Sequence, residues 1–493
     1  MFKGPLAGRY PVVAAMVVFA LVPYLALSAA LGPITPIIAH ELEMSPQTLN
    51  VTVGLANAGY AVGTVLAVQF AQHLPQRRML IVYGSLLVIG SVLTASAVNA
   101  GMFIVGHVLQ GLCTSLLLIA AVPPLITGYP EARLRETAVV LNMCIFGAVA
   151  LGPVFAGIQA ESDDWRPLFW VIAGIAVAAL VLSVLTFEYT PPAGKGTKID
   201  SIALGLASAG CVAGFFGASE LLTHSFSEAR VWAPLIGGLL LIVVLFIREY
   251  TAEHPLLCVR SLFSTFPVAG IVAAICAAGA SVSATLLTST VLTDRMTPLH
   301  LGLLYLPEVG GAVIAAIVFG RVFRTRLLHY YVLAGLTFLS AGIVVMNSAQ
   351  PPTSPLIAVG SGLVGVGVGS SVVPALFIAG FSLRSNQVQR VFAIVELMRA
   401  VAAFLIAPVL LYVATTVESN PVSGTRDALW ICLGISVAGA VLGAALYALG
   451  GVRHPPKPSV SQWMTGERPG WDSPPLFARL TGSDGGNRPD EIC

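Results

Sequence analysis

The sequence predicts an all-α integral membrane protein in which two six-helix bundles are joined by two inserted helices, giving fourteen transmembrane spans. Of its 493 residues, 56% are hydrophobic and 10% are charged, whereas about a quarter of the residues of an ordinary soluble domain are charged. A bilayer core about 30 Å thick requires about 20 consecutive apolar residues per helix. Fourteen such runs follow one another, and the placement of basic residues between them supports the same count.

The fourteen apolar runs are taken in chain order. The first is expected to be a span and not a secretory signal, because the apolar core of a signal has only about 7 to 15 residues and thirteen similar runs follow it. The run that begins near Trp232 is the shortest. The runs begin near Val12, Val51, Met79, Met102, Ala138, Leu168, Ile202, Trp232, Phe266, Leu301, Leu328, Leu356, Val391 and Ala428.

Basic residues alternate between the two sides of the predicted membrane. If the N-terminus lies inside, the inner segments hold twenty Lys and Arg residues, and one further residue, Arg399, falls within a span. The outer loops hold four, namely Arg166, Arg230, Arg295 and Arg426. Basic loops remain cytoplasmic, so both termini are predicted to be cytoplasmic.

Polar connections divide the chain into four parts. Residues 1–190 form the first six-helix bundle, residues 191–264 hold the two inserted helices with their flanking loops, and residues 265–450 form the second bundle. Residues 451–493 are rich in Pro, Gly, Ser and charge and have no apolar period, which predicts a flexible cytoplasmic tail.

Several classes of function are disfavoured by what the sequence lacks. No phosphate-binding loop, no His and Cys residues at metal spacing and no serine elbow occur, so we expect no enzyme activity, no direct ATP drive, no cofactor and no metal. Most of the seven cysteines lie within apolar runs and are expected to pack as small hydrophobic residues. The net charge of +2 and the membrane location exclude nucleic acid as a natural partner.

The fifth apolar run contains Gly147, Gly152, Pro153 and Gly157. Proline inside a helix removes one backbone hydrogen bond and bends the axis, and glycine lets a neighbouring helix approach closely. Membrane helices tolerate this combination where neighbours compensate for the lost bond. The sequence therefore predicts a thin, kinked helix that presses against another helix.

This helix leads into a Trp-Arg-Pro-Leu-Phe box at Trp165 to Phe169. The segment GAVALGPVFAG (Gly147 to Gly157) followed by this box resembles the fifth-span antiporter motif of the major facilitator superfamily, in its fourteen-span drug:proton antiporter branch. Ala156 replaces one glycine of the motif, and Pro167 replaces its second tryptophan. Weaker similarities follow in the expected order, in GHVLQGLCTS (Gly106 to Ser115), HPLLCVRSLF (His254 to Phe263), LGLLYLPEVGGAV (Leu301 to Val313) and VELMRAVAAF (Val395 to Phe404).

The resemblance implies two bundles that rock about a central cavity and expose it to each side of the membrane in turn. It implies that the kinked fifth span forms a sliding seam with span ten, where Gly310 and Gly311 offer a matching thin surface. Gly59 and Gly63 in span two have the spacing that would serve a corresponding contact with span thirteen.

Four ionisable residues within the spans are candidates for proton coupling, because a charged group there costs about 2.5 to 3.5 kcal/mol on insertion scales. Glu308 in span ten is either a proton or cation site or an acid that reaches outside water. Glu396 and Arg399 share one helix face and form either a structural ion pair or a substrate contact. His107, at the place of an arginine in the fourth-span motif, is either a proton carrier or a hydrogen-bonded core histidine.

The candidate cavity residues are neutral, which suits an amphipathic or weakly polar molecule, although Ser and Thr also pack helices in membrane proteins. They come from spans one, four and nine and comprise Tyr24, Ser28, Gln110, Thr114, Ser281, Ser283, Thr285 and Thr288.

Two departures from the family pattern weaken the expectation of proton coupling. The cytoplasmic gating loop after span two retains Arg77 and Arg78, but Val68, Gln72 and Pro75 stand at the places of its glycine and aspartate. The first span contains no acidic residue where such antiporters often carry one.

The leading hypothesis is a secondary active transporter in the cytoplasmic membrane that exports a small organic or drug-like compound in exchange for protons. Its partners would be that substrate, protons and the lipid bilayer, and the sequence does not specify an oligomeric state. The alternatives are an uncoupled uniporter or lipid-moving relative, and a non-transporting membrane scaffold or sensor.

Overall fold

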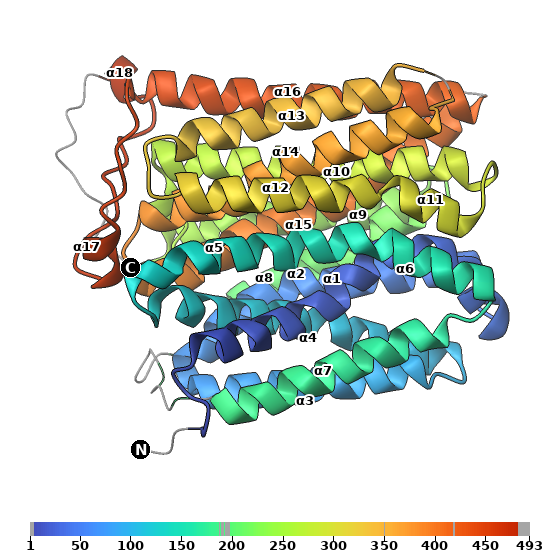
Figure 1. Cartoon of the computed structure of the whole chain (residues 1–493), viewed down its shortest axis with the longest axis horizontal. Helices are drawn as coiled ribbons and strands as arrows, with labels where there is room; N and C mark the ends of the chain where they lie inside the picture. Colours follow the sequence, from blue (N-terminus) through green and yellow to red (C-terminus); the bar gives the residue numbers. More distant parts are fainter. Residues whose placement is uncertain are drawn as a thin grey trace. The chain divides into compact units, whose positions relative to one another are not determined.

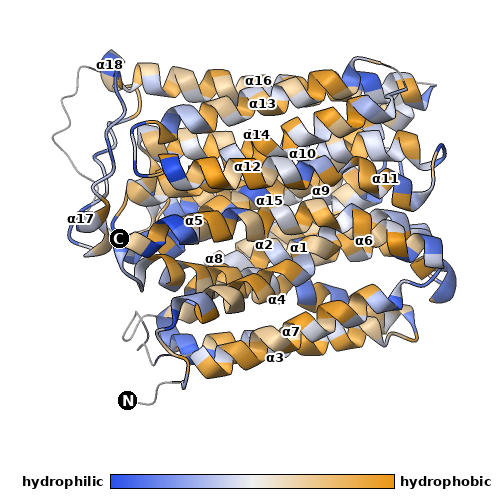
Figure 2. Cartoon of the chain, viewed as in Figure 1, coloured by the Kyte–Doolittle hydropathy of each residue, from blue (hydrophilic) through white to orange (hydrophobic). Residues whose placement is uncertain are grey.

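The computed structural model describes residues 4–186, 188, 192, 198–349, 351–417 and 420–481. Within these ranges the chain is helical apart from turns, loops and one isolated bridge between Ser264 and Pro475. Fourteen helical segments of the described chain are long and apolar enough to cross a membrane, so the predicted fold class and number of spans are confirmed. The helices can be followed by their labels in Figure 1, and Figure 2 shows that apolar residues dominate along them.

The first four spans are single helices whose starts are set by sequence. The Ser45 side chain accepts a hydrogen bond from the Thr48 amide, and the Asn99 side chain accepts one from the Met102 amide. Both residues are favoured N-caps because they satisfy amides that have no partner within the helix. These spans are α1 (Tyr10–Glu41), α2 (Pro46–His73), α3 (Gln76–Ala95) and α4 (Ala100–Thr127).

Span five is interrupted, as its glycines and proline predict. In the predicted orientation, with the N-terminus inside, its inner half consists of η1 (Glu131–Arg133) and α5 (Leu134–Asn142), and its outer half is α6 (Ala148–Ser162). A five-residue π-helix, η2 (Met143–Gly147), separates the two halves, and such segments occur often at functional sites. The regular helix is therefore broken at the segment ending in Gly147, while Pro153 lies inside α6. Span six is α7 (Arg166–Thr186).

The inserted pair consists of α8 (Ser201–Glu220) and α9 (Ala229–Thr251). The Asp200 side chain caps α8 by accepting the Ala203 amide. Although the run at Trp232 is the shortest in the sequence, α9 extends over 23 residues and qualifies as a span. Part of the connection before α8 lies outside the described residues.

The second bundle begins after η3 (Arg260–Leu262) with α10 (Thr265–Thr293). Span ten is divided, like span five, into α11 (Pro298–Leu304) and α12 (Leu306–Val322). Span thirteen also ends in a π-helix, η5 (Val413–Val417). The remaining elements are α13 (Leu328–Asn347), α14 (Ser354–Phe381), η4 (Ser385–Gln387), α15 (Val388–Tyr412), α16 (Pro421–Leu449), α17 (Val460–Met464) and α18 (Ala478–Thr481).

Contacts group the chain into two compact units whose boundaries cut through spans five and ten. Unit 1 comprises Met1–Gly128, Gly147–Leu245 and Ser289–Leu306, and unit 2 comprises Tyr129–Phe146, Phe246–Thr288 and Pro307–Cys493. The outer halves α6 and α11 thus belong to unit 1, and the inner halves α5 and α12 belong to unit 2. Helix α8 and most of α9 belong to unit 1, so the inserted pair is largely part of the unit that contains the first bundle.

The C-terminal tail differs from the expectation of a flexible segment. Its described part, residues 451–481, contains α17 and α18 and makes backbone hydrogen bonds to the ends of α10 and α14. Two buried tryptophans, Trp463 and Trp471, anchor it. Single apolar residues of this kind form no periodic pattern in the sequence, so the composition of the segment does not predict that it folds. Residues 482–493 lie outside the described residues.

Candidate functional site

The interior of unit 1 contains a neutral polar cluster built by α1, α2 and α4. The Tyr24 hydroxyl donates to the Asn57 side-chain oxygen at 2.7 Å. The Tyr24 ring stacks on Tyr60 with centroids 5.9 Å apart and lies 5.7 Å from the ring of His107. A Cβ atom on Gly111 would clash with the Ala56 carbonyl of α2 and would meet the Tyr24 ring at 3.2 Å, so the absence of a side chain at position 111 lets α4 approach α2 closely beside the tyrosine.

His107 is held by a chain of side-chain hydrogen bonds. Its Nδ1 lies 3.1 Å from Oε1 of Gln110, and Nε2 of Gln110 donates to the Ser91 hydroxyl at 3.2 Å. With the Gln110 amide in this orientation, its oxygen accepts from Nδ1–H of the imidazole. All three side chains are buried. This geometry is that of a hydrogen-bonded core histidine, which is one of the two interpretations of His107. The other interpretation, a proton carrier, stays a prediction.

The Trp-Arg-Pro-Leu-Phe box ties together the outer ends of three spans. The Arg166 guanidinium donates to the Glu41 carboxylate and to the carbonyls of Ala95 and Ala97, and the Trp165 indole N–H also donates to Glu41. These bonds connect the start of α7 with the end of α1 and the loop after α3. Trp165 is fully buried, so it is a packing residue.

Aromatic contacts connect this outer clasp, defined as Glu41, Trp165 and Arg166, to the polar cluster. Phe103 lies edge-on to Trp165 with centroids 5.7 Å apart and stacks on His107 at 5.9 Å. A continuous series of packed rings therefore runs within unit 1 from Trp165 through Phe103 and His107 to Tyr24.

The thin outer half of span five makes the close contacts that its glycines predict. A Cβ atom on Gly152 would lie 2.6 Å from the Ala26 carbonyl oxygen of α1, and one on Gly157 would lie 2.6 Å from the Pro298 carbonyl oxygen beside α11. Gly302 of α11 packs directly against the Pro153 carbonyl. Real Cβ atoms do not approach backbone this closely, so these positions require glycine.

Four other candidate seam glycines are described by their packing within their own units. Within the described part of unit 2, a Cβ placed on Gly310 would meet no atom of another element within 4 Å, and Gly311 packs against α14. The described partner of the span five seam is Gly302, one helical segment earlier. Within unit 1, Gly59 and Gly63 face α4 near Leu112, and their contact with span thirteen stays a prediction. Small-residue spacing identifies a thin helix face but does not specify which helix it meets.

Unit 2 carries a buried ion pair in α15. Both Nε and Nη2 of Arg399 donate to one oxygen of Glu396, at 2.9 and 2.6 Å, and both side chains are buried. The predicted sharing of one helix face is confirmed. Because the guanidinium and carboxylate neutralise each other, the pair can remain in the membrane interior.

Glu308 lies in the first turn of α12, immediately after the break in span ten. Its side chain is half-buried, and its backbone packs against Gly365 of α14. It is thus an acid at a helix break inside a span, where an ionisable group is a candidate for proton or ion binding.

The remaining candidates are dispersed and largely satisfied locally. Ser28, Ser281, Ser283 and Thr288 donate to carbonyls of their own helices, as hydroxyls within helices commonly do. Thr285 is half-buried in α10, and the Thr114 hydroxyl is buried with no partner among the described residues. Arg77 and Arg78 lie in the first turn of α3.

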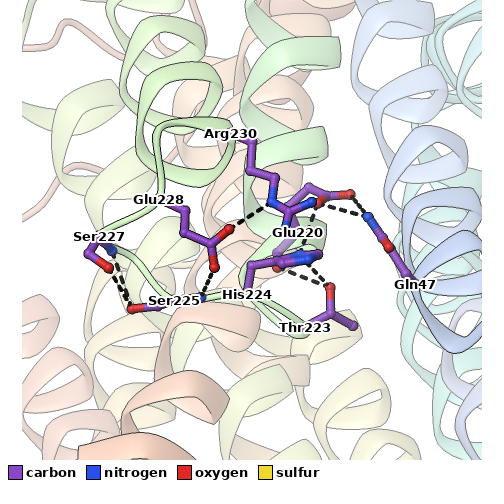
Figure 3. Close-up of polar contacts among 8 residues, drawn as sticks. All are labelled: Gln47, Glu220, Thr223, His224, Ser225, Ser227, Glu228 and Arg230. Atoms are coloured by element: carbon purple, nitrogen blue, oxygen red, sulfur yellow. Dashed lines mark hydrogen bonds and ion pairs between the residues drawn. The ribbon is translucent and has the colours of Figure 1, made fainter.

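Glu220, at the end of α8, is buried although it is an acid. Figure 3 shows its carboxylate between the Gln47 side-chain amide of α2 and the His224 ring. The Gln47 nitrogen lies 2.9 Å from one carboxylate oxygen, and Nδ1 of His224 lies 3.1 Å from the other.

The neighbouring Glu228 pairs with Arg230 at the surface. Partial burial alone would raise the pKa of Glu228, but hydrogen bonds from Arg230 and the Ser225 amide, with the charge of Arg230, hold it below its ordinary value.

Sequence reasoning missed several members of these clusters. Asn57 and Ser91 are polar residues inside apolar runs, and that is the only signal they give. Glu41 lies at a helix end, where an acid is unremarkable. His329 is fully buried between the rings of Phe266 and Trp471. Because Trp471 belongs to the tail, this contact exists only when the tail is packed on the helices. Among the described residues, no group of three or more His, Cys, Asp or Glu is placed to hold a metal ion.

Known proteins support the interpretation of this architecture. The chain is 29% identical over 311 residues to a "Multidrug resistance protein B homolog" of Mycobacterium tuberculosis, covering 61% of this chain and 57% of that protein. It is 25% identical over 388 residues to the "Drug efflux pump JefA" of the same species, covering 71% and 73%. It is 24% identical over 348 residues to the "Uncharacterized MFS-type transporter YubD" of Bacillus subtilis, covering 69% and 66%.

The match to the first of these relatives thus spans less than two thirds of that protein's length. The family model described as Major Facilitator Superfamily matches residues 17–350, which is more than half of the chain. The fourteen apolar helices agree with the fourteen-span branch of that superfamily. This chain therefore belongs to the Major Facilitator Superfamily and is a multi-pass protein of the cell membrane.

Proposed function

We propose that the protein exports small organic, drug-like compounds across the cell membrane by alternating access, in exchange for protons. The relatives named as multidrug resistance and drug efflux proteins support the substrate class. The neutral cluster around Tyr24 and Gln110 supports an amphipathic substrate, since it offers hydrogen bonds and aromatic faces without a net charge.

The packing of the outer half of span five is the observation that carries this proposal. Gly157 and Gly302 bring α6 and α11 into backbone contact, and both helices continue, across a break, into segments of unit 2. Spans five and ten each have this design. A transporter that alternates between two conformations requires such close but unbonded helix surfaces, because they can slide without breaking hydrogen bonds.

For the proton carrier we propose Glu308. It is an acid without a basic partner among the described residues, at a helix break within the membrane region. The Glu396 and Arg399 pair is already neutralised, and His107 is engaged by Gln110. These three residues are therefore assigned to support the structure or the substrate site, and Glu308 is assigned to bind and release the proton.

Transport by purified protein in liposomes tests the proposal, with ethidium as the probe and an imposed pH gradient as the driving force. We expect the gradient to drive ethidium accumulation, and the variant Glu308→Gln to retain downhill movement but lose accumulation. The matched control is Glu161→Gln, which changes an exposed acid at the end of α6. Gradient-driven transport that is unchanged in Glu308→Gln would exclude this residue as the carrier.

The seam is tested separately by two glycine variants. In Gly157→Ala the new methyl group would meet backbone atoms of Pro298 and Leu299, whereas in Gly174→Ala no described atom lies within 4 Å. We expect Gly157→Ala to reduce both downhill and driven transport and Gly174→Ala to leave both intact. If both variants transport normally, the seam does not carry the conformational change. Downhill movement without any proton dependence in the unmodified protein would favour the uncoupled alternative.

A further inference from the structure

The tail supplies missing partners to the start of α10. The first amides of a helix have no acceptors within the helix, and here the Thr265 amide donates to the Pro474 carbonyl at 2.9 Å while the Phe266 amide donates to the Ser473 hydroxyl at 3.0 Å. The Thr265 hydroxyl also donates to the Pro475 carbonyl at 3.0 Å. A segment far away in the sequence thus acts as the N-cap of span nine.

The same tail supplies donors to the end of α14. The Trp463 indole N–H donates to the carbonyls of Gly380 and Leu383, at 3.1 and 2.9 Å, and the Gly470 amide donates to the Phe381 carbonyl at 2.7 Å. The last carbonyls of a helix otherwise have no donor within it. The tail therefore bonds to the C-terminal end of span twelve as well as to the N-terminal end of span nine.

Aromatic packing fixes this connection. Trp471 lies against Phe266 of α10, His329 of α13 and Phe381 of α14, with ring centroids 5.7, 4.6 and 5.5 Å apart. Its indole N–H donates to the Ser382 hydroxyl at 2.9 Å. Burial of a large aromatic ring with its polar atom satisfied is strongly stabilising, so this tail position is a specific anchor.

The tail also lies beside the inner half of span five, within unit 2. Helix α17 contacts η1, and Arg324, after α12, forms an ion pair with Glu131 of η1. Deeper in the unit, the Asn142 side chain of α5 donates to the Gly369 carbonyl of α14 at 2.8 Å. The inner half of span five is thus held on the second bundle next to the tail.

We infer that residues 459–475 form a strap that clamps the predicted cytoplasmic ends of spans nine and twelve and latches the inner half of span five against them. The inference rests on the alternating access proposed above, in which opening toward the cytoplasm would move α5 out of this position and the strap would restrain that movement. This inference does not depend on the identity of the substrate or on proton coupling.

Cysteine labelling of the full-length protein in lipid nanodiscs tests the strap. Thr137 of α5 is fully buried, and Thr137→Cys is nearly isosteric, so its reaction with a maleimide reports departure of α5 from its site. The last residue, Cys493, is changed to Ser, and labelling at position 137 is read by peptide mass spectrometry. We expect Trp463→Ala with Trp471→Ala to raise the labelling rate about tenfold or more.

Milder variants keep the test valid if the double variant does not fold. Ser473→Ala removes one cap of α10 and should raise labelling about threefold, whereas Ser461→Ala, at an exposed position of α17, should have no effect. Trp430→Ala removes an exposed tryptophan of α16 and controls for loss of an aromatic residue. Unchanged labelling in the folded strap variants would overturn the inference. An equal rise in Trp430→Ala would overturn it as well, because it would show general loosening.

Discussion

The interiors of the two units are built on different electrostatic principles. Apart from Glu220 at the end of α8, the buried polar side chains of the described part of unit 1 are neutral or carry an imidazole, and the cluster of Tyr24, Asn57, His107 and Gln110 is one group among them. Unit 2 buries the charged pair of Glu396 and Arg399 and holds the half-buried Glu308. Removing a buried polar contact is therefore expected to cost a different amount of folding free energy in each unit.

A neutral hydrogen bond that is lost leaves a desolvated dipole, whereas a broken buried ion pair leaves an uncompensated charge. The first costs about 1 to 3 kcal/mol and the second about 3 to 5 kcal/mol. Unit 1 can therefore tolerate rearrangement of its polar contacts during a transport cycle. Unit 2 is expected to keep its ion pair throughout the cycle.

The largest expected effect comes from breaking the ion pair of unit 2. Arg399→Ala leaves the Glu396 carboxylate buried without its partner and should lower the free energy of unfolding by about 3 to 5 kcal/mol. Thermal unfolding in detergent measures this loss. The double variant Glu396→Gln with Arg399→Met removes both charges and should recover most of the stability. If the double variant is as unstable as Arg399→Ala, the charge imbalance is not the cause.

Gln110→Ala tests the neutral cluster of unit 1 and should have a smaller effect. It removes the partner of both His107 and Ser91, and we expect a loss of about 1 to 3 kcal/mol, again by thermal unfolding. His107 would also lose the acceptor that orients its ring, so downhill ethidium transport should slow. A loss as large as that of Arg399→Ala would contradict the proposed difference between the units.

Tyr24→Phe removes a single hydrogen bond while keeping the ring contacts with Tyr60 and His107. We expect a loss of about 1 kcal/mol, with substrate affinity in a transport assay changed more than stability if the hydroxyl contacts the substrate. Tyr330→Phe, at an exposed position of α13, is the control and should behave like the unmodified protein. Equal behaviour of the two variants would place the Tyr24 hydroxyl outside the substrate site.

The smallest effect is expected at the surface ion pair of Figure 3. Glu228→Gln should leave stability and transport unchanged at neutral pH, because exposed ion pairs contribute little. Its carboxyl pKa lies below the ordinary value, so the pair is present at neutral pH and any small contribution is lost only as the pH falls through that lowered pKa. Glu220→Gln changes the buried neighbour and should be measurably destabilising; thermal unfolding at pH 7 compares the two variants.

The number of spans can be read from the amino-acid sequence alone, because membrane thickness fixes the length of an apolar run. The sequence also indicates which segments are special. Gly152, Pro153 and Gly157 identify a thin, interrupted helix, and the spacing of Glu396 and Arg399 places their side chains on one face. These features depend on neighbours in the chain or on helical periodicity, so local sequence is sufficient to predict them.

The partners that these elements meet are set by tertiary packing. Within unit 1, Gly302 faces Pro153 and Gly59 meets α4, because the tilt and rotation of a helix come from packing over its whole length. Glu220 is buried since Gln47 of a distant helix covers it. The tail folds although its composition predicts flexibility, because the unsatisfied backbone groups at the ends of α10 and α14 lie where its few tryptophans and polar atoms can reach them. Such complementarity exists between segments hundreds of residues apart and leaves no periodic pattern in either one.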